Sequence, residues 1–77
     1  MNLYLIFQNV NKNYDTYDSA IVAAESEEEA KNIHPNGEFS WKYNDTWCDK
    51  KDVNVELIGI ASEYTEKGVI LASFNAG

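Results

Sequence analysis

The sequence predicts a small α+β fold, in which an antiparallel sheet of four to five strands carries one short helix packed on a face. Along the chain, apolar stretches recur in which successive side chains would point to alternate faces, as they do in a β-strand. A single capping box marks the start of one helix, and Asn, Asp and Gly residues separate the stretches as turns do. With 77 residues, the chain makes a single domain, residues 1–77.

The first strand is predicted at residues 3–10. Its alternation puts Leu3, Leu5 and Phe7 on one face, and Tyr4 and Ile6 on the other. Apolar residues on both faces predict a central place in the sheet. Turn-forming residues follow, and residues 19–24 form a second apolar strand, antiparallel to the first if a hairpin loop joins them.

The helix is predicted to begin at Ser26, which forms a capping box with Glu29. The three glutamates of the first turn suit the positive end of the helix dipole. Ala30 and Ile33 would face the sheet, and Pro35 would end the helix after about two turns because proline disfavours helical geometry in the preceding residue.

Two strands and a short aromatic strand are predicted after the helix. Phe39, Trp41 and Tyr43 alternate and predict the short strand, followed by an irregular polar segment at residues 44–52. Residues 53–61 alternate as a third principal strand with one wetter face. After a loop or single helical turn, Gly68 opens a final strand that runs to residue 74.

The small size limits where a site can lie. A chain of this length buries only about 60% of its unfolded surface, so we expect most apolar residues to be committed to the core. Little room is left for a deep pocket within one subunit. A site is therefore expected on the surface or between subunits of a homo-oligomer.

The charge excludes some classes of partner. The net charge is −7, from 13 acidic residues against six lysines and no arginine. Direct binding of DNA or RNA depends on cationic side chains that neutralise phosphates, and anionic membranes attract basic segments for the same reason. The acidic balance instead favours a basic protein partner, or it serves only to keep a small protein in solution.

The compartment is predicted from three absences in the sequence. The first residues have no basic region and too short an apolar run for a signal peptide. No stretch approaches the roughly 18 apolar residues of a membrane span. Cys48 is the only cysteine, so no internal disulfide forms. These features predict a cytoplasmic protein.

Two groups of residues are candidates for binding. Tyr14, Asp15, Tyr17 and Asp18 occupy one polar loop, where tyrosines provide contact area with a polar group. The alternative is a hairpin loop whose tyrosines only cover the edge of the sheet.

The second group comprises Trp41 and Trp47 with their aromatic neighbours. Such residues anchor interfaces or stack on the bases of a nucleotide. The alternative, which suits a small domain better, is that they complete the core.

Catalysis is not predicted. His34 and Cys48 are each the only residue of their type, too few for a zinc site, and nothing in the pattern supplies an orienting group for a Cys–His pair. His34 is interpreted as a helix C-terminal residue favoured by the dipole. We therefore predict no catalytic residues, metal or cofactor, and a protein that is not an enzyme.

The Tyr-Asp-Thr-Tyr-Asp-Ser run at residues 14–19 and the closing residues 68–77 resemble small proteins encoded by bacteriophages and prophages. The Glu-rich run before residue 30 and His34-Pro35 extend the resemblance over most of the chain. It implies an accessory protein in the host cytoplasm, and it makes Asn75, in the closing segment, a further candidate for binding.

Three hypotheses follow from the residues and the resemblance. In the first, the chain is a non-enzymatic inhibitor that binds a host defence protein stoichiometrically, as anti-CRISPR and other anti-immune proteins do. In the second, an oligomer sequesters an immune signalling nucleotide, with aromatic side chains stacked on it and backbone amides or lysines binding its phosphates. In the third, the chain is a structural or regulatory component of the phage.

Overall fold

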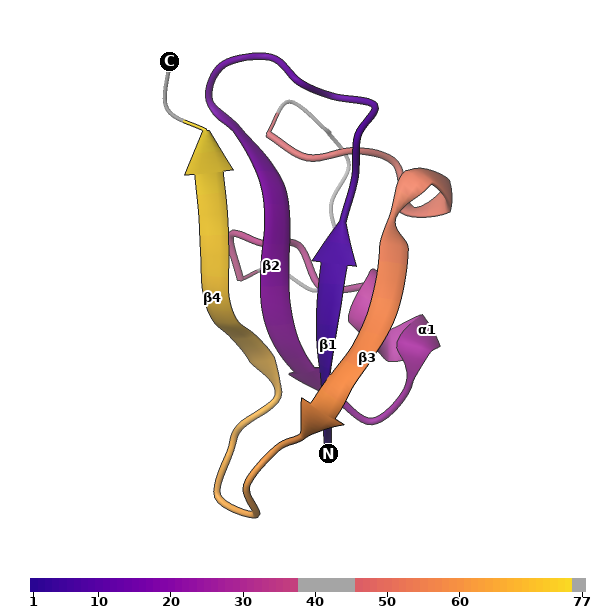
Figure 1. Cartoon of the computed structure of the whole chain (residues 1–77), viewed down its shortest axis with the longest axis vertical. Coiled ribbons are helices and arrows are strands. Elements are labelled where there is room, and N and C mark those ends of the chain that lie inside the picture. Colours follow the sequence, from indigo (N-terminus) through magenta and orange to yellow (C-terminus); the bar gives the residue numbers. More distant parts are fainter. Residues whose placement is uncertain (38–45, 76–77) are drawn as a thin grey trace.

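The sheet has four antiparallel strands with one short helix packed against it, which confirms the predicted fold class. A computed structural model describes residues 1–37 and 46–75 (Figure 1). The strands are β1 (Asn2–Phe7), β2 (Thr16–Ala24), β3 (Asn54–Ile60) and β4 (Gly68–Asn75).

The strand order is β3-β1-β2-β4, so β1 has the central place that its two apolar faces predict. Each neighbouring pair is antiparallel, and β1 and β2 form the predicted hairpin. β3 and β4 are consecutive in the chain but lie at opposite edges of the sheet. Residues 61–67 therefore pass around one end of the sheet, at the bottom of Figure 1.

The ends of the first two strands differ from the prediction. β1 stops at Phe7, because the next side chain, Gln8, bonds to the backbone of the following turn. β2 begins at Thr16 rather than at residue 19, because Thr16 and Tyr17 pair with the last two residues of β4.

Helix α1 (Glu27–Lys31) begins with the predicted capping box. Ser26 Oγ accepts a hydrogen bond from the amide of Glu29 at 3.2 Å. Glu29 Oε1 in turn accepts from the amide of Glu25 at 2.8 Å, one residue before the N-cap. The first bond satisfies an amide that the first turn of a helix leaves without a partner, and the second ties the residue before the N-cap to the helix.

The predicted end of the helix at Pro35 is wrong, since α1 has five residues and stops at Lys31. Asn32 ends it, because its amide bonds to the carbonyl oxygen of Glu29 and its Nδ2 donates to the carbonyl oxygen of Glu28. Hydrogen bonds from an asparagine to nearby backbone groups compete with the backbone bonds that would continue the helix.

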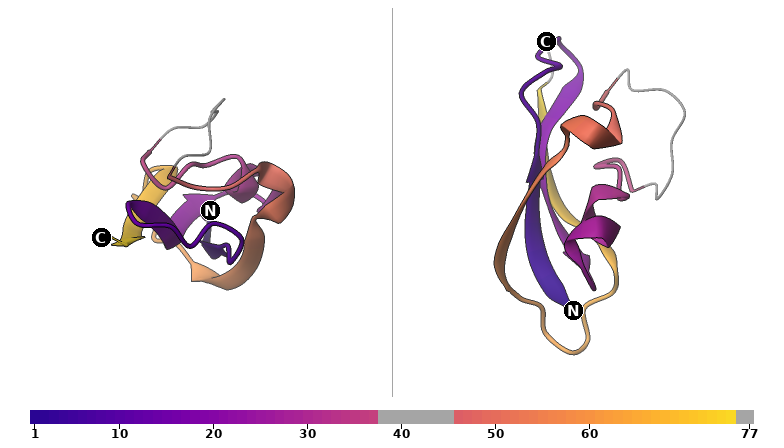
Figure 2. Two further views of the ribbon diagram at one scale, coloured as in Figure 1. Left: turned by 90° about the horizontal axis from the view of Figure 1, so that it is seen from above. Right: turned by 90° about the vertical axis from the view of Figure 1, so that its right-hand side faces the viewer.

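The core lies between one face of the sheet and the segments that cover it. The right-hand view in Figure 2 shows α1 and the 3-10 helix η1 (Lys50–Asp52) on the same side of the sheet. Tyr4, Ile6 and Val22 point to this side and are buried against Ile33 and Trp47. Ile33 is buried as predicted, although it follows the helix rather than belonging to it.

No described helix or loop covers the opposite face, which we call the open face (Figure 2). The strand register groups its residues in three rows across the sheet. Taken from β3 to β4, they are Asn54, Phe7, Ser19 and Ser73; Glu56, Leu5, Ile21 and Leu71; and Gly59, Leu3, Ala23 and Gly68.

The expectation that most apolar residues are committed to the core is wrong. None of the four leucines of the chain belongs to the buried core. Leu3, Leu5 and Leu71 lie on the open face, and Leu57 lies exposed in edge strand β3. The alternation of the strands turns the first three away from the only face that α1 covers.

The prediction for His34 needs correction, and the prediction for the aromatic strand concerns residues outside the described part of the chain. His34 is not the C-terminal residue of the helix, as predicted, but lies beyond the helix, where it is buried. Its Nδ1 accepts a hydrogen bond from the amide of Asn36 at 3.0 Å. The short aromatic strand of Phe39, Trp41 and Tyr43 lies outside the residues that the structure describes.

Candidate functional site

Gln8 organises the loop at residues 9–15, which joins β1 to β2 and which we call the tyrosine loop. Gln8 is only 5% exposed, and its side chain makes four hydrogen bonds. Nε2 donates to the carbonyl oxygens of Asn11 and Tyr17, at 2.8 and 2.9 Å. Oε1 accepts from the amides of Val10 and Asn11, at 2.9 and 2.7 Å. The full hydrogen-bonding capacity of the amide is used to fix the turn.

Two polar side chains of this region hold the loop from within the fold. Thr16 Oγ1 donates to the carbonyl oxygen of Asn13 at 2.6 Å, and Thr16 is buried. Asn11 Nδ2 donates to the carbonyl oxygen of Trp47 at 2.8 Å, which ties the loop to the segment before η1. The loop is therefore held in one conformation before any partner arrives.

The end of the loop is anchored to the last residue of β4. Asp15 has a φ of 60°, the left-handed region that aspartate tolerates better than most residues. Its amide donates to the carbonyl oxygen of Asn75 at 2.7 Å. The structure thus brings Asp15 and Asn75, 60 positions apart in the numbering, to one end of the sheet.

The loop presents one aromatic side chain and two nearby carboxylates to solvent. Tyr14 is 77% exposed. Asp15 and Asp18 are exposed as well, and Asp18 Oδ1 accepts a hydrogen bond from Ser19 Oγ at 3.1 Å. A fixed tyrosine beside carboxylates can make apolar contact and hydrogen bonds with a partner at a small cost in entropy.

Tyr17 connects this surface to the core. Its ring is half-buried and meets Phe74 edge-on, with ring centroids 4.8 Å apart. On its other side His34 lies perpendicular to it, at 6.0 Å. Tyr17 therefore supports the loop from beneath, while Tyr14 projects from it.

The predicted tryptophans do not join this surface. Trp47 is fully buried in the core, and only its carbonyl oxygen reaches the loop, through Asn11. Within the described part of the chain, its indole Nε1 has no hydrogen-bond partner. Trp41 lies outside the described residues.

Sequence reasoning missed Gln8 and Asn11. The sequence does contain a signal for Gln8. This residue continues the alternation of Tyr4 and Ile6, which predicts that its side chain points into the core. A glutamine in that position needs partners for its buried amide, and the adjoining turn supplies them.

Cys48 and His34 are buried and do not form an accessible reactive pair. Burial first, and then the carboxylates of Asp52 and Asp49, raise the pKa of the Cys48 thiol from 9.0 to about 12. The thiol is protonated at neutral pH and is therefore a poor nucleophile. Within residues 1–37 and 46–75, no three His, Cys, Asp or Glu side chains are grouped so that they could hold a metal ion.

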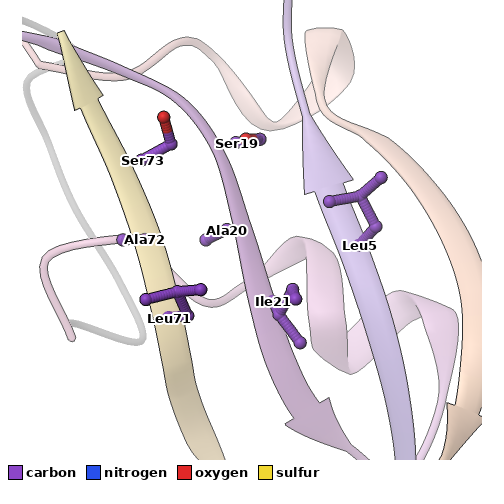
Figure 3. Close-up of a pocket in the computed structure, with 7 residues that line it drawn as sticks. All are labelled: Leu5, Ser19, Ala20, Ile21, Leu71, Ala72 and Ser73. Atoms are coloured by element: carbon purple, nitrogen blue, oxygen red, sulfur yellow. The ribbon is translucent and has the colours of Figure 1, made fainter.

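The open face contains a hollow of about 310 Å³. Figure 3 shows it between β2 and β4, with Ile21 and Leu71 toward one end and Ser19 and Ser73 toward the other. Leu5 lines it from β1. No charged residue is among those that line it, so the hollow suits an apolar group better than a phosphate.

Comparison with models of protein families found no match to this chain, and neither did comparison with curated proteins or with solved structures. Among the described residues, no helix has the length and apolar character needed to cross a bilayer.

Proposed function

We propose that the chain is a non-enzymatic, phage-encoded binding protein that inhibits a host defence protein by stoichiometric contact in the host cytoplasm, and that the tyrosine loop makes this contact. The single observation that carries the proposal is the fixed loop around Gln8, which holds Tyr14 out into solvent.

The energetic reasoning concerns entropy. A flexible loop loses conformational freedom when it binds, and this loss subtracts from the affinity. Here the buried amide of Gln8 and the hydroxyl of Thr16 have already fixed the turn. Tyrosine is also among the residues that most often contribute large binding energies in interfaces.

The charge supports a basic partner. Asp15 and Asp18, which follow the exposed Tyr14 in the chain, are exposed as well, and the whole chain has a net charge of −7. Such a surface speeds the approach of a positively charged protein, and the effect weakens as salt is added. Defence proteins that handle nucleic acids have basic surfaces of this kind.

The nucleotide-sequestering alternative has no specific observation in its favour. With lysines as the phosphate ligands, it requires lysines and aromatic rings to converge, yet Lys50 and Lys51 lie in η1 while the Trp47 ring is buried. Lys42 and Trp41, the other members of that set, lie outside the described residues. A structural or regulatory role in the phage is likewise unsupported by any particular contact.

The test is a capture experiment on bacterial lysates that contain defence systems. Tagged protein is used as bait, and bound proteins and released small molecules are both identified by mass spectrometry. We expect one host protein at near-stoichiometric ratio. Its measured affinity should fall roughly 30-fold in Tyr14→Ala, as for a tyrosine at the centre of an interface.

Tyr64→Ala is the matched control, because Tyr64 is 87% exposed but lies in the loop at residues 61–67. It should bind as the wild type does. Equal binding by Tyr14→Ala and Tyr64→Ala would remove the tyrosine loop from the proposal. Recovery of a nucleotide without a protein would refute inhibition by direct contact and favour sequestration.

A further inference from the structure

The open face has the composition of an interface rather than of a solvated surface. Its central row carries Leu5, Ile21 and Leu71 side by side on three neighbouring strands (Figure 3). Leu3 and Phe7 extend this apolar strip along β1. An antiparallel sheet that faces water on one side normally alternates polar residues there, and this sheet does so only toward its edges.

Few charges lie on or next to this face, and the Asp18 carboxylate reaches it only at its end, where it accepts a hydrogen bond from Ser19 Oγ at 3.1 Å. Among the described acidic residues, only Glu56 lies in its three rows, at the β3 edge. The glutamates of α1 and the aspartates around η1 lie with the elements on the opposite side of the sheet. Two copies of a chain with a net charge of −7 can therefore meet through their open faces with little repulsion.

The area also matches what a dimer needs. Strands about 4.8 Å apart with about 3.3 Å per residue give a four-stranded face of roughly 20 by 25 Å. This projected area of about 500 Å² per partner, about 1,000 Å² in total, reaches the lower bound for a specific interface. The core itself is small, since three of the buried residues of its cluster are alanines, Ala20, Ala24 and Ala30, so burying the open face would add apolar contact that the core lacks.

We propose that the open face is the interface of a symmetric homodimer, in which two sheets pack face to face. A two-fold axis parallel to the strands sets β1 of each copy over β2 of the other. Phe7, 37% exposed, then lies above the hollow beside Ser19 and Ser73 of the partner copy. The same axis sets Glu56 over the opposite edge strand instead of over its own counterpart.

Pairing through a sheet edge is the less favourable way to form a dimer. Both edge strands change register, with Ile58 as the extra residue of β3 and Ile70 as that of β4. Bulges of this kind twist an edge and interrupt its row of free backbone groups. In the face-to-face dimer the edges remain unpaired, and both tyrosine loops lie at the same end.

The test is sedimentation equilibrium of the purified chain from micromolar to millimolar concentration. We expect a reversible monomer–dimer equilibrium. Leu71→Asp should raise the dissociation constant at least roughly 100-fold, because it replaces an apolar contact with a second carboxylate that faces Glu56 of the other copy. Phe7→Ala should raise it roughly tenfold by leaving the hollow of the partner copy unfilled.

Ile60→Asp is the matched control. Ile60 is 82% exposed on an edge strand, and it pairs with Asn2, whose side chain bonds to Tyr4 on the covered face. This variant makes the same change in charge and should dimerise normally. Circular dichroism of each variant checks that the fold is intact, and Leu71, at 66% exposure, tolerates a polar residue in the monomer.

A monomer at every concentration would overturn the proposal. So would a dimer that persists in both Leu71→Asp and Phe7→Ala, because it would use another surface. The measurement needs no host partner, and Tyr14→Ala should dimerise like the wild type. Failure of the dimer is therefore distinguishable from failure of the proposed function.

Discussion

Gln8 shows how one polar residue in an apolar strand pattern shapes the surface of the molecule. It occupies the position after β1 that the alternation directs into the core. Desolvating its amide would be unfavourable without partners, and the four bonds to the turn provide them. The same bonds fix the tyrosine loop, so stability and recognition depend on one side chain.

We predict that Gln8→Ala lowers the free energy of unfolding by about 2–4 kcal/mol, because it leaves backbone groups of the turn without partners. Urea denaturation followed by tryptophan fluorescence measures the change. Asn54→Ala is the control, since Asn54 donates one long bond of 3.3 Å to the carbonyl oxygen of Phe7 at an exposed site. If both variants lost the same small amount, the turn would not depend on Gln8.

At the scale of elements, α1 depends on its ends more than on its interior. A helix of five residues is too short to be stable by itself. Glu29 holds it in two ways, through the amide of Glu25 and through Lys67 Nζ at 2.9 Å. These contacts lower the pKa of the Glu29 carboxyl, the bond from Glu25 being the larger cause. The ion pair joins α1 to the connection between β3 and β4.

Loss of the N-cap should destabilise the protein measurably. Ser26→Ala removes the bond from the Glu29 amide, and we expect the free energy of unfolding to fall by about 1 kcal/mol. Thermal and urea unfolding measure this difference. Ser62→Ala makes the same change in an exposed loop, where the hydroxyl contacts only Thr65, and should have a smaller effect. Equal effects of the two substitutions would show that the cap adds nothing particular.

At the scale of the whole molecule, the fold separates its charges from its apolar surface. The acidic side chains gather on α1, around η1 and on the loops, while the open face is almost free of charge. The core lies on the acidic side of the sheet, and Cys48 is buried in it beside the acidic segment before η1. Its ionisation is thereby coupled to unfolding of the whole domain.

We predict that stability falls as the pH rises above 9.0 and that Cys48 contributes to the fall. The thiol has a pKa of about 12 in the folded chain, against 9.0 without burial. Between these values the unfolded chain has released the proton and the folded chain has retained it, so rising pH favours unfolding. Urea denaturation across this range should give a shallower decline for Cys48→Ala. Parallel curves for the two proteins would contradict the coupling, since all other groups are common to both.

Local patterns in the sequence were sufficient to predict the four principal strands, the central place of β1 and the capping box at Ser26. Each of these depends on neighbours in the chain, such as the alternation of residues 3–7 or the three-residue spacing from Ser26 to Glu29. The turn after β1 was also predicted from its composition, but the predicted loop was too long, since Tyr17 and Asp18 belong to β2. Which residues project from the loop was not predicted.

Tertiary structure decided what the patterns leave open. Alternation assigns Leu3, Leu5 and Phe7 to one face of β1, but only the position of α1 determines that this face is the uncovered one. The pairing of Asp15 with Asn75 and the burial of Trp47 likewise depend on residues distant in the chain. The physical reason is that periodicity specifies the orientation of a side chain relative to its own strand, whereas burial depends on what the rest of the chain packs against it.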